Sequence, residues 1–379
     1  MNILYLNTFN TGADGIGRHI ETISTYFHQH PELGIKPGVC LVHPKGTLSD
    51  NLQKEGVSVY CLGCKNGHDP RILSRFYSVI KDFKPDIIHA HVPAIMEYVY
   101  LRLFASKIPI VKTIHGISLE NLLGSHTNTI KNKIFQYITK FVTPTIAQDI
   151  YVSKGVKDFY QNLNGKVIYN PFTFTESRNN SNKLHSLIGV PENAIIWGTA
   201  CRLSREKRPE LFTHVMTELL LRFPDSHAVV CGNGDKSTMK ELELIVNKAN
   251  VTKRFHWLGY QPDAPELTKE LSFFIMTSIT EGMPTALLEA MAAKVPIAFM
   301  EANGGLRDLA DLHKHEGPIG IVVKDNDVNE MINKISTIIS NKKLIKKYTD
   351  NAFEIGKKHF DINNITLKLR DVYIYTLQK

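Results

Sequence analysis

The chain has 379 residues, of which 43% are hydrophobic and 22% are charged, as in ordinary folded globular proteins. These values exclude a fibrous or disordered protein, and the length favours two domains. The net charge of +8 is uneven, because residues 1–170 hold 18 basic against 12 acidic side chains. That excess favours an anionic lipid surface or an acidic substrate. Nucleic acid is disfavoured as a partner, since the basic residues are scattered and form no aromatic-studded basic motif.

The cysteines point to a reduced compartment. They are odd in number and mostly lie in apolar runs typical of buried strands: Cys40, Cys61, Cys64, Cys201 and Cys231. The CxxC pair at 61–64 has no second pair to complete a structural zinc site. The N-terminus lacks the pattern of a signal peptide, and no apolar run approaches the ~18 residues of a membrane-spanning helix. We therefore expect a cytoplasmic protein.

Short β-rich runs alternate with longer helical stretches almost from end to end of the chain. In the first half the expected strands are residues 2–6, 38–42, 57–62, 86–89, 110–114, 142–146 and 166–169. In the second half they are residues 195–200, 227–231, 254–258, 273–277, 296–299 and 320–323. This alternation is typical of doubly wound parallel sheets, so the predicted fold class is α/β.

A polar segment without apolar periodicity, residues 170–183, separates the two sets of strands. It predicts an N-terminal domain over residues 1–170 and a C-terminal domain over residues 184–356. The last stretch, residues 357–379, contains a helical run that could cross back to the first domain. Ligands of such sheets bind beyond the carboxyl ends of the strands, so we expect the site in the loops that follow strands.

A glycine-rich loop follows the first strand. In TFNTGADGIGRHI, Gly12, Gly15 and Gly17 stand between this strand and a helix that begins near Ile16. Glycine lets backbone N–H groups approach an oxygen-rich ligand, and a helix N-terminus favours negative charge. The spacing is not GxGxxG, so the dinucleotide fingerprint is absent, and a tight turn alone would also need glycine.

Two cations follow the first strand of the second half. In CRLSREKRPE, Arg202 and Lys207 lie on one loop just before a helix. The arginine fork and the mobile lysine charge suit a diphosphate. Solvated charges in a polar loop are an equal alternative for this segment alone, because Arg205 and Arg208 also lie there.

The most specific segment is a strand FFIMTS, a loop ITEGMP and a helix TALLEAMAA. Pro284 suits the first helical turn, and Gly282 frees the backbone before it. Glu281 precedes the helix and Glu289 lies one to two turns inside it; both suit hydrogen bonds to sugar or ribose hydroxyls. An ordinary helix with two acidic residues would explain the acids alone. The backbone N–H groups expected to face an anion belong to Met283, Thr285 and Ala286.

Together these segments resemble a known family. The fragments TGADGIGRH, PDIIHAH, KTIHG, IYNP, CRLSREKRP, CGNGD and EGMPTALLEAMAAKVPIAF, followed by NGG, occur in this order along the chain. The set is similar to the retaining glycosyltransferases of family four. The resemblance implies the GT-B fold, with two Rossmann-like domains that face each other across a cleft. It also implies transfer of a sugar from a nucleotide diphosphate sugar to a hydroxyl acceptor, with retention of the anomeric configuration.

The resemblance also implies roles for single residues. It places Glu281 against the donor sugar and Glu289 on the ribose of the nucleotide. Arg202 and Lys207 correspond to the pair that clasps the diphosphate. His115 in KTIHG matches a histidine that lies near the reacting sugar, so Glu281 and His115 are the expected catalytic residues.

The remaining donor contacts are backbone groups and a helix N-terminus. Gly15 and Gly17 match the glycine loop, although Asp14 stands where related sequences often have another glycine. No metal cofactor is expected, because two cations and a helix N-terminus already neutralise the diphosphate. The turn and helix start on the donor side comprise Gly282, Met283, Pro284 and Thr285.

Three further motifs favour structural interpretations at least as much as functional ones. His89 and His91 alternate on one strand face, but no third metal ligand is evident, so a structural role is favoured. The DND run at 325–327 follows a late strand and reads, with Glu330, as a capping box for the next helix. Residues 131–141 carry basic and apolar residues at helical spacing, which suits peripheral contact with the inner face of a membrane and packing on the protein equally.

The substrates are less defined than the reaction. By analogy with the family, the acceptor would be a bacterial surface polysaccharide, lipopolysaccharide precursor or lipid-linked glycan. A sugar-nucleotide epimerase of the same fold and a non-catalytic polyanion binder stay open as alternatives. The base and the sugar of the donor depend on several loops, among which residues 259–261 are a candidate.

Overall fold

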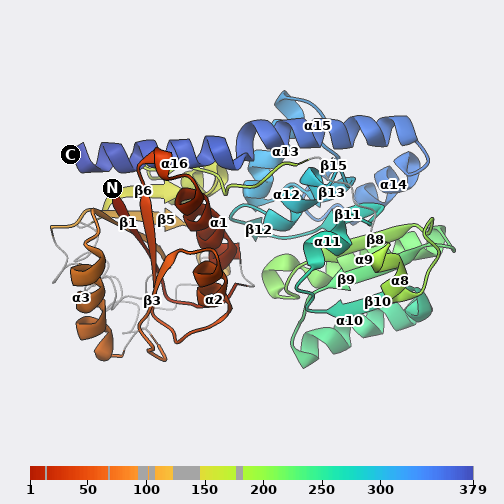
Figure 1. The fold of residues 1–379 in the computed structure, drawn as a ribbon. Helices are drawn as coiled ribbons and strands as arrows, with labels where there is room; N and C mark the ends of the chain where they lie inside the picture. Colours follow the sequence, from red (N-terminus) through yellow and green to blue (C-terminus); the bar gives the residue numbers. More distant parts are fainter. Residues whose placement is uncertain are drawn as a thin grey trace. The chain divides into compact units, whose positions relative to one another are not determined.

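The computed structural model describes residues 1–12, 15–66, 69–92, 101, 107–122, 146–175 and 182–378. The chain divides into two compact units, shown in Figure 1. Unit 1 comprises Met1–Pro171 with Ile362–Lys379, and unit 2 comprises Phe172–Asp361. Each unit has its own parallel sheet and its own hydrophobic core.

Unit 1 is built on a seven-stranded sheet with the order β3-β2-β1-β4-β5-β6-β7, in which every recorded strand pair is parallel. The strands are β1 (Asn2–Asn7), β2 (Lys36–Leu41), β3 (Ser58–Cys61), β4 (Ile87–Val92), β5 (Ile110–Ile114), β6 (Ile146–Tyr151) and β7 (Lys166–Val167). The described helices are α1 (Gly15–Gln29), α2 (Thr47–Lys54), α3 (Arg71–Phe83), α5 (Leu119–Leu122), α7 (Lys154–Tyr160) and α16 (Ile362–Gln378), with a 3-10 turn η1 (Pro31–Leu33).

The strand β1 shows why this sheet is covered on both faces. Its alternate side chains point to opposite faces, and Ile3 and Tyr5 belong to one buried cluster while Leu4 and Leu6 belong to another. A central parallel strand therefore reads as a continuous apolar run. Helix α16 completes the first cluster, with residues spaced four apart on one helical face: Ile365, Leu369 and Tyr373.

Unit 2 has a six-stranded sheet with the order β10-β9-β8-β11-β13-β15, and its recorded strand pairs are also parallel. The strands are β8 (Ile196–Ala200), β9 (His227–Cys231), β10 (Phe255–Gly259), β11 (Phe273–Met276), β13 (Ile297–Met300) and β15 (Ile321–Val323), and a separate short pair joins β12 (Thr280–Glu281) to β14 (Asn303–Gly304). The helices are α8 (Lys183–Ile188), α9 (Pro209–Arg222), α10 (Lys236–Lys248), α11 (Ala264–Thr268), α12 (Thr285–Ala292), α13 (Gly305–His315), α14 (Val328–Ile338) and α15 (Lys342–Phe360), with 3-10 turns η3 (Arg205–Lys207) and η4 (Thr252–Arg254).

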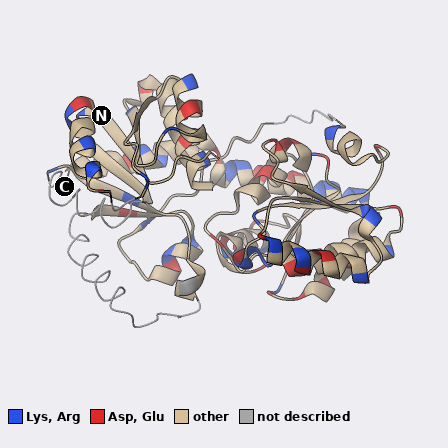
Figure 2. Cartoon of the chain, turned by 90° about the horizontal axis from the view of Figure 1, so that it is seen from below, with Lys and Arg blue, Asp and Glu red and all other residues tan. Residues whose placement is uncertain are grey.

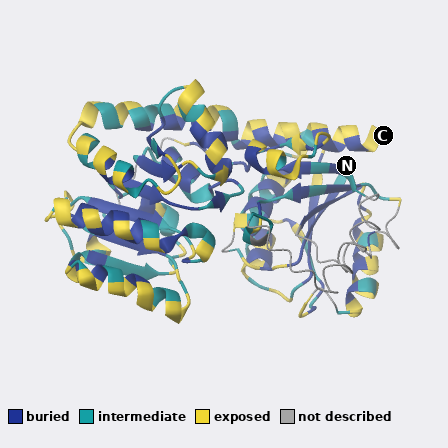
Figure 3. Ribbon diagram, turned by 180° about the vertical axis from the view of Figure 1, so that it is seen from behind, coloured by how far each residue is buried: buried dark blue, intermediate teal, exposed yellow. Residues whose placement is uncertain are grey.

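The helices of both units bury one face and expose the other. Figure 3 shows mostly buried strands and helices whose exposed residues lie on their outer sides. In unit 2 the core centres on Trp197, whose ring is fully buried and whose Nε1–H donates to the Ser226 hydroxyl at 3.0 Å. Figure 2 shows acidic and basic residues mixed along the helices, whereas the strands carry few charges. Among the described residues, no helix combines the length and the apolar character that a membrane crossing requires.

The structure corrects two predicted boundaries. The strand predicted at 142–146 is instead β6, which begins at Ile146 and runs to Tyr151; residues 142–145 lie outside the described part. Residue 357 lies inside α15, and the break before the last helix falls at Asp361. Of the predicted linker 170–183, residues 170–175 and 182–183 are described. Lys183 already begins α8, and the buried Phe174 packs edge-on against Phe353 of α15.

Candidate active site

In unit 2 the strand order reverses between β8 and β11. The chain adds β9 and β10 on one side of β8, and then adds β11, β13 and β15 on the other side. Such a switch point leaves a place for a ligand beyond the carboxyl ends of the two strands, because the following loops diverge there. The loop after β8 carries Lys207, and the loop after β11 carries Glu281.

Lys207 and Glu281 meet at this point. The Lys207 ammonium donates to the Glu281 carboxylate at 2.6 Å, and the Ser278 hydroxyl donates to the same Oε1 atom at 2.7 Å. The two charged side chains are 20% and 10% exposed, so the pair is largely but not completely shielded from water. The predicted diphosphate cation and the predicted sugar-binding acid therefore lie in direct contact.

The two loops are also joined through their backbones. The Thr277 hydroxyl donates to the carbonyl of Lys207 at 3.2 Å, and the Ile279 N–H donates to the carbonyl of Glu206 at 2.8 Å. Burial acts to raise the pKa of Glu206, but hydrogen bonds and the cations Arg202 and Lys207 outweigh it and lower that pKa. Arg202 reaches Glu206 at 3.4 Å and is 81% exposed, so its guanidinium is available to a ligand.

The helix α12 begins at Thr285, the first residue of the predicted helix TALLEAMAA. Pro284 stands just before it, and the helix runs from Thr285 to Ala292. Gly282 and Met283 lie against Gly305, where a Cβ atom would come within 2.7 Å of the Gly282 carbonyl oxygen. Glycine at the start of α13 thus lets that helix approach the loop that carries the acid.

Glu281 is held from the other side as well. It pairs in register with Gly304 in the short parallel bridge between β12 and β14. The neighbouring Thr280 hydroxyl is buried and has no hydrogen-bond partner among the described residues. Buried polar groups are normally paired, so this hydroxyl marks a place where a polar ligand fits. Glu289 lies half-buried inside α12, as predicted for the second acid.

A second group of loops follows the neighbouring strands β9 and β10. The Gly232 N–H donates to the Gly259 carbonyl at 2.7 Å, and the Tyr260 N–H donates to Asn233 Oδ1 at 3.1 Å. Gly232 has φ 153° and lies directly against the Cys201 backbone, which leaves no space for a side chain. Tyr260 is 53% exposed, so this ring presents an apolar face beside the end of the sheet. These loops include the predicted base-recognition segment at 259–261.

A pocket of about 350 Å³ lies beyond β13 and β15. The polar lining was not predicted from the sequence, although three of its residues, Glu301, Asn303 and Arg307, stand close together in the polar run EANGGLRD after a strand. Asn303 of this lining belongs to β14, which pairs with the strand of Glu281. The polar lining residues are Glu301, Asn303, Arg307, Lys324 and Asp325.

Unit 1 places its predicted residues around the corresponding switch point, between β1 and β4. Gly15 is exposed at the first position of α1, and a Cβ atom there would meet nothing within 4 Å. Gly17 is buried in the first turn of the same helix. His115 follows β5, and its Nε2 forms a 2.8 Å hydrogen bond with Nδ1 of His91.

The sequence showed no third ligand beside His89 and His91, but the structure places two further histidines next to His91. His19 from α1 and His115 come so close that one ligating nitrogen of each of the three residues lies within 4.8 Å of the others. The sequence could not show this, because the three side chains come from different elements. His89 is different, since its two nitrogens bond to the hydroxyls of Tyr373 and Thr113 at 2.6 and 2.7 Å; its role is structural.

The histidine cluster is electrically neutral. Burial, followed by the neighbouring His89, lowers the pKa of His115 to about 3. Burial and the adjacent histidines also lower the pKa of His19 and of His91 well below the ordinary range. His19 Nδ1 and His91 Nε2 are buried and have no partner among the described residues. The cluster can therefore offer neutral imidazole nitrogens to a hydroxyl group.

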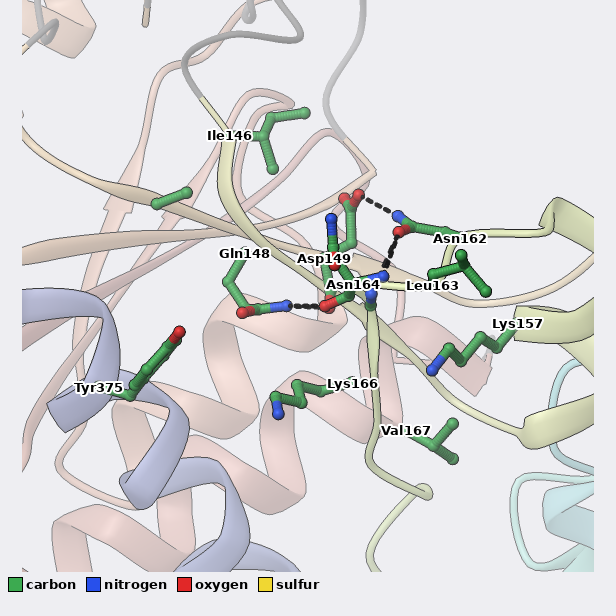
Figure 4. Close-up of a pocket in the computed structure, with 12 residues that line it drawn as sticks. Ile146, Gln148, Asp149, Lys157, Asn162, Leu163, Asn164, Lys166, Val167 and Tyr375 are labelled. Carbon is green, nitrogen blue, oxygen red and sulfur yellow. Dashed lines mark hydrogen bonds between the residues drawn. The ribbon is translucent and has the colours of Figure 1, made fainter. Parts of the chain in front are cut away.

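A pocket of about 670 Å³ in unit 1 contains none of the predicted site residues. It lies beside β6 and β7, and Figure 4 shows hydrogen bonds among four of its lining residues, Gln148, Asp149, Asn162 and Asn164. Asn162 Nδ2 donates to Asp149 Oδ2 at 2.8 Å, and Gln148 Nε2 donates to the Asn164 carbonyl at 3.0 Å. Because none of the predicted site residues lines it, this pocket is not the candidate site.

Among the remaining motifs, the DND run has a structural explanation. The Asp327 carboxylate accepts a 2.9 Å hydrogen bond from the Glu330 N–H and caps α14. Cys61 and Cys64 are free thiols, and Cys64 is buried. Residues 131–141 lie outside the described part of the chain.

Comparison with known proteins follows the same division into two halves. A family model described as "Glycosyltransferase Family 4" matches residues 13–173, and one described as "Glycosyl transferases group 1" matches residues 181–355. A relative in Escherichia coli, UDP-Gal:alpha-D-GlcNAc-diphosphoundecaprenol alpha-1,3-galactosyltransferase, is 26% identical over 342 residues, which is 86% of this chain and 85% of the relative. The lipopolysaccharide core biosynthesis mannosyltransferase LpsB of Rhizobium meliloti is 24% identical over 54% of this chain and 56% of the relative.

A solved structure shares the architecture. The structure of Anabaena Alr3699/HepE in complex with UDP matches with a TM-score of 0.78 at 20% identity, over 98% of this chain and 99% of that one. At this identity the likeness shows the fold alone, which is GT-B. The chain therefore belongs to the family 4 glycosyltransferases, with a group 1 glycosyltransferase domain in its second half.

Proposed function

We propose that this enzyme transfers a sugar from a UDP-sugar to a hydroxyl group of a lipid-linked glycan, with retention of the anomeric configuration. The observation that carries the proposal is the contact between Lys207 and Glu281 at the switch point of unit 2. The name of the E. coli relative includes a UDP-linked sugar and a diphosphoundecaprenol acceptor, and the Anabaena structure holds UDP. Both support a uridine donor and a place in bacterial polysaccharide or lipopolysaccharide synthesis.

The ion pair between Lys207 and Glu281 indicates how the donor would bind. An incoming diphosphate offers Lys207 a stronger partner than one carboxylate, and exposed Arg202 adds a bidentate fork. Glu281 is then released to accept hydrogen bonds from the hydroxyls of the donor sugar, while Glu289 binds the ribose. The N-terminus of α12, at Thr285, adds its dipole to the charge that stabilises the leaving diphosphate.

The neutral cluster in unit 1 suits the sugar rather than the phosphates. His115 carries no positive charge at neutral pH, because its pKa is about 3. We assign it to hydrogen bonds with a hydroxyl of the reacting sugar, and Gly15 and Gly17 to backbone contacts with donor phosphate or acceptor. No metal is required, since protein groups neutralise the diphosphate. A lipid-linked acceptor would place the enzyme peripherally at the inner face of a membrane.

The test begins with binding. Thermal-shift measurements with UDP, GDP and ADP should show stabilisation by UDP, because a ligand stabilises the protein that binds it. UDP-glucose and UDP-galactose are then incubated with and without GlcNAc-diphosphoundecaprenol, and the products are separated by chromatography. Sugar transfer that depends on the acceptor supports the proposal. Release of UDP with a changed sugar and no acceptor would identify an epimerase instead.

A further inference from the structure

Arg208 combines a buried charge with an unusual backbone conformation. It follows Lys207 directly, is 7% exposed and has φ 48°, in the left-handed region. A non-glycine residue is strained in this region, so surrounding contacts must hold it there. No sequence pattern distinguishes it from the other three cations of its loop.

The guanidinium of Arg208 binds two further loops. Its Nε donates to the Thr277 carbonyl at 2.6 Å, and its Nη2 donates to the Ser278 carbonyl at 3.0 Å, both after β11. Its Nη1 donates to Asn326 Oδ1 at 2.7 Å, and its Nη2 forms an ion pair with Asp325, both after β15. One side chain therefore joins the loops that follow β8, β11 and β15.

The residues that Arg208 contacts are themselves hydrogen-bonded to Lys207 and Glu281, which form the ion pair. Ser278, whose carbonyl Arg208 binds, donates its own hydroxyl to Glu281. The Thr277 hydroxyl returns to the carbonyls of Lys207 and Arg208 at 3.2 Å each. A lysine could not replace this network, because one ammonium group lacks the planar fork that reaches four acceptors in different directions.

We propose that Arg208 is a positioning residue, which sets the separation of the Lys207 ammonium and the Glu281 carboxylate by holding their two loops together. The inference rests on the proposed function, in which both groups contact the donor. It adds a residue that touches no substrate and acts through its neighbours.

The first experiment needs no substrate. The protein is treated with a limiting amount of an acetylating reagent, and the acetylation rate of each lysine is measured by mass spectrometry. In the variant Arg208→Gly, glycine adopts the positive φ without strain, so the fold should survive the loss of the side chain. Lys207 should then acetylate about fivefold faster or more, because its loop opens locally, while Lys294 keeps its rate.

The matched control is Arg222→Ala. Arg222 is exposed at the C-terminal end of α9 and donates to Asn333 and Ser336 of α14. Like Arg208, it is an arginine that joins two elements. This variant should leave the rate at Lys207 unchanged. An unchanged rate at Lys207 in Arg208→Gly would overturn the proposal, and so would an equal rise at all lysines, which indicates general loosening. If the glycine variant fails to fold, Arg208→Lys replaces it in the same experiment. In that variant the acetylation rate of Lys207 should rise by less than the rise expected for Arg208→Gly.

The second experiment measures transfer from the UDP-sugar that the wild-type enzyme accepts. Arg208→Gly should lower kcat about tenfold or more with a smaller change in KM, since small misplacement of reacting groups is costly. In the background of Lys207→Ala it should cause little further loss, because the pair of Lys207 and Glu281, whose separation Arg208 sets, is already broken. Additive losses would contradict the assignment. If no UDP-sugar is turned over, the proposed function fails, yet the acetylation rates still decide the role of Arg208.

Discussion

Lys207 and Glu281 are 74 residues apart in the sequence, yet the Lys207 ammonium lies 2.6 Å from the Glu281 carboxylate. The adjacency of β8 and β11 in the sheet order brings them together. Without a ligand, each charge satisfies the other in a site that is largely shielded from water. Donor binding therefore has to exchange one ionic contact for another, rather than fill a preformed charged cavity.

The first prediction concerns the cation of this pair. Lys207→Ala should lower kcat about 10²-fold or more, because a charge that stabilises the leaving diphosphate is lost. The measurement is a transfer assay with the accepted UDP-sugar. Lys248→Ala, which removes an exposed lysine at the end of α10, serves as the control and should keep full activity. Wild-type turnover in Lys207→Ala would refute the role of this lysine.

The two acids should respond differently to loss of charge. Glu289→Gln should weaken UDP binding, because the ribose hydroxyls lose a charged acceptor. Glu281→Gln should bind UDP as tightly as the wild type or more tightly, since UDP has no sugar and Lys207 is freed for its phosphates. Its kcat with a UDP-sugar should nevertheless fall. Titration calorimetry with UDP distinguishes the two variants.

Exposed Glu218 of α9 provides the control for both acids. Glu218→Gln should change neither UDP binding nor kcat. Weaker UDP binding in Glu281→Gln would contradict the division of roles between the two acids.

The fold class followed from the sequence because most strands are apolar runs between polar loops. The run at β9 was predicted to the residue, since His227–Cys231 is bounded by polar turns on both sides. The strand β6 was misplaced because it carries Gln148 and Asp149 in its middle. Gln148 is satisfied by the carbonyl of Asn164, and Asp149 lies in register with Lys112 of β5. Such partners are invisible in a local pattern.

The site was predictable only as a set of separate loops. The sequence placed Lys207 and Glu281 after strands, but their contact depends on which strands are neighbours. The histidine cluster depends on the same kind of information, because α1, β4 and the loop after β5 each contribute one residue to it. Arg208 was missed since its burial and its acceptors arise only when three loops meet.

The histidine cluster predicts a loss of stability in mild acid. An unfolded histidine has a pKa of ~6.5, whereas burial lowers the folded pKa of His19, His89, His91 and His115. Below pH ~6.5 the unfolded chain therefore binds more protons, and the free energy of unfolding falls as the pH decreases. Above that pH both states are neutral, and the contribution is constant.

Urea unfolding at about pH 7.5 and about pH 5.5 checks this sign, with a slope of up to ~1.4 kcal/mol per pH unit for each histidine. His19→Asn should reduce the slope, because one of the buried titrating groups is removed. A free energy of unfolding that is independent of pH in this interval would contradict the neutral state of the cluster.

Removal of metal ions should leave transfer unaffected. Arg202, Lys207 and the start of α12 supply the positive charge that a divalent ion would otherwise bring to the diphosphate. We expect the same kcat before and after dialysis against EDTA, with metal content measured by plasma mass spectrometry. Activity lost on dialysis and restored by a divalent cation would show that the neutralisation by protein groups is insufficient.

The close approach of Gly305 to the acidic loop gives the last prediction. In Gly305→Ala the new Cβ atom would lie 2.7 Å from the Gly282 carbonyl oxygen and 2.9 Å from the Met283 Cα atom. Backbone atoms cannot rotate away as a side chain would, so the loop must shift, at a cost of about 1–3 kcal/mol in the free energy of unfolding. Because Glu281 directly precedes Gly282 and Met283, kcat should decrease together with the free energy of unfolding. Gly15→Ala is the control for stability, since its Cβ atom would meet nothing within 4 Å. Equal stability of the two alanine variants in urea unfolding would show that the loop and α13 can separate without cost.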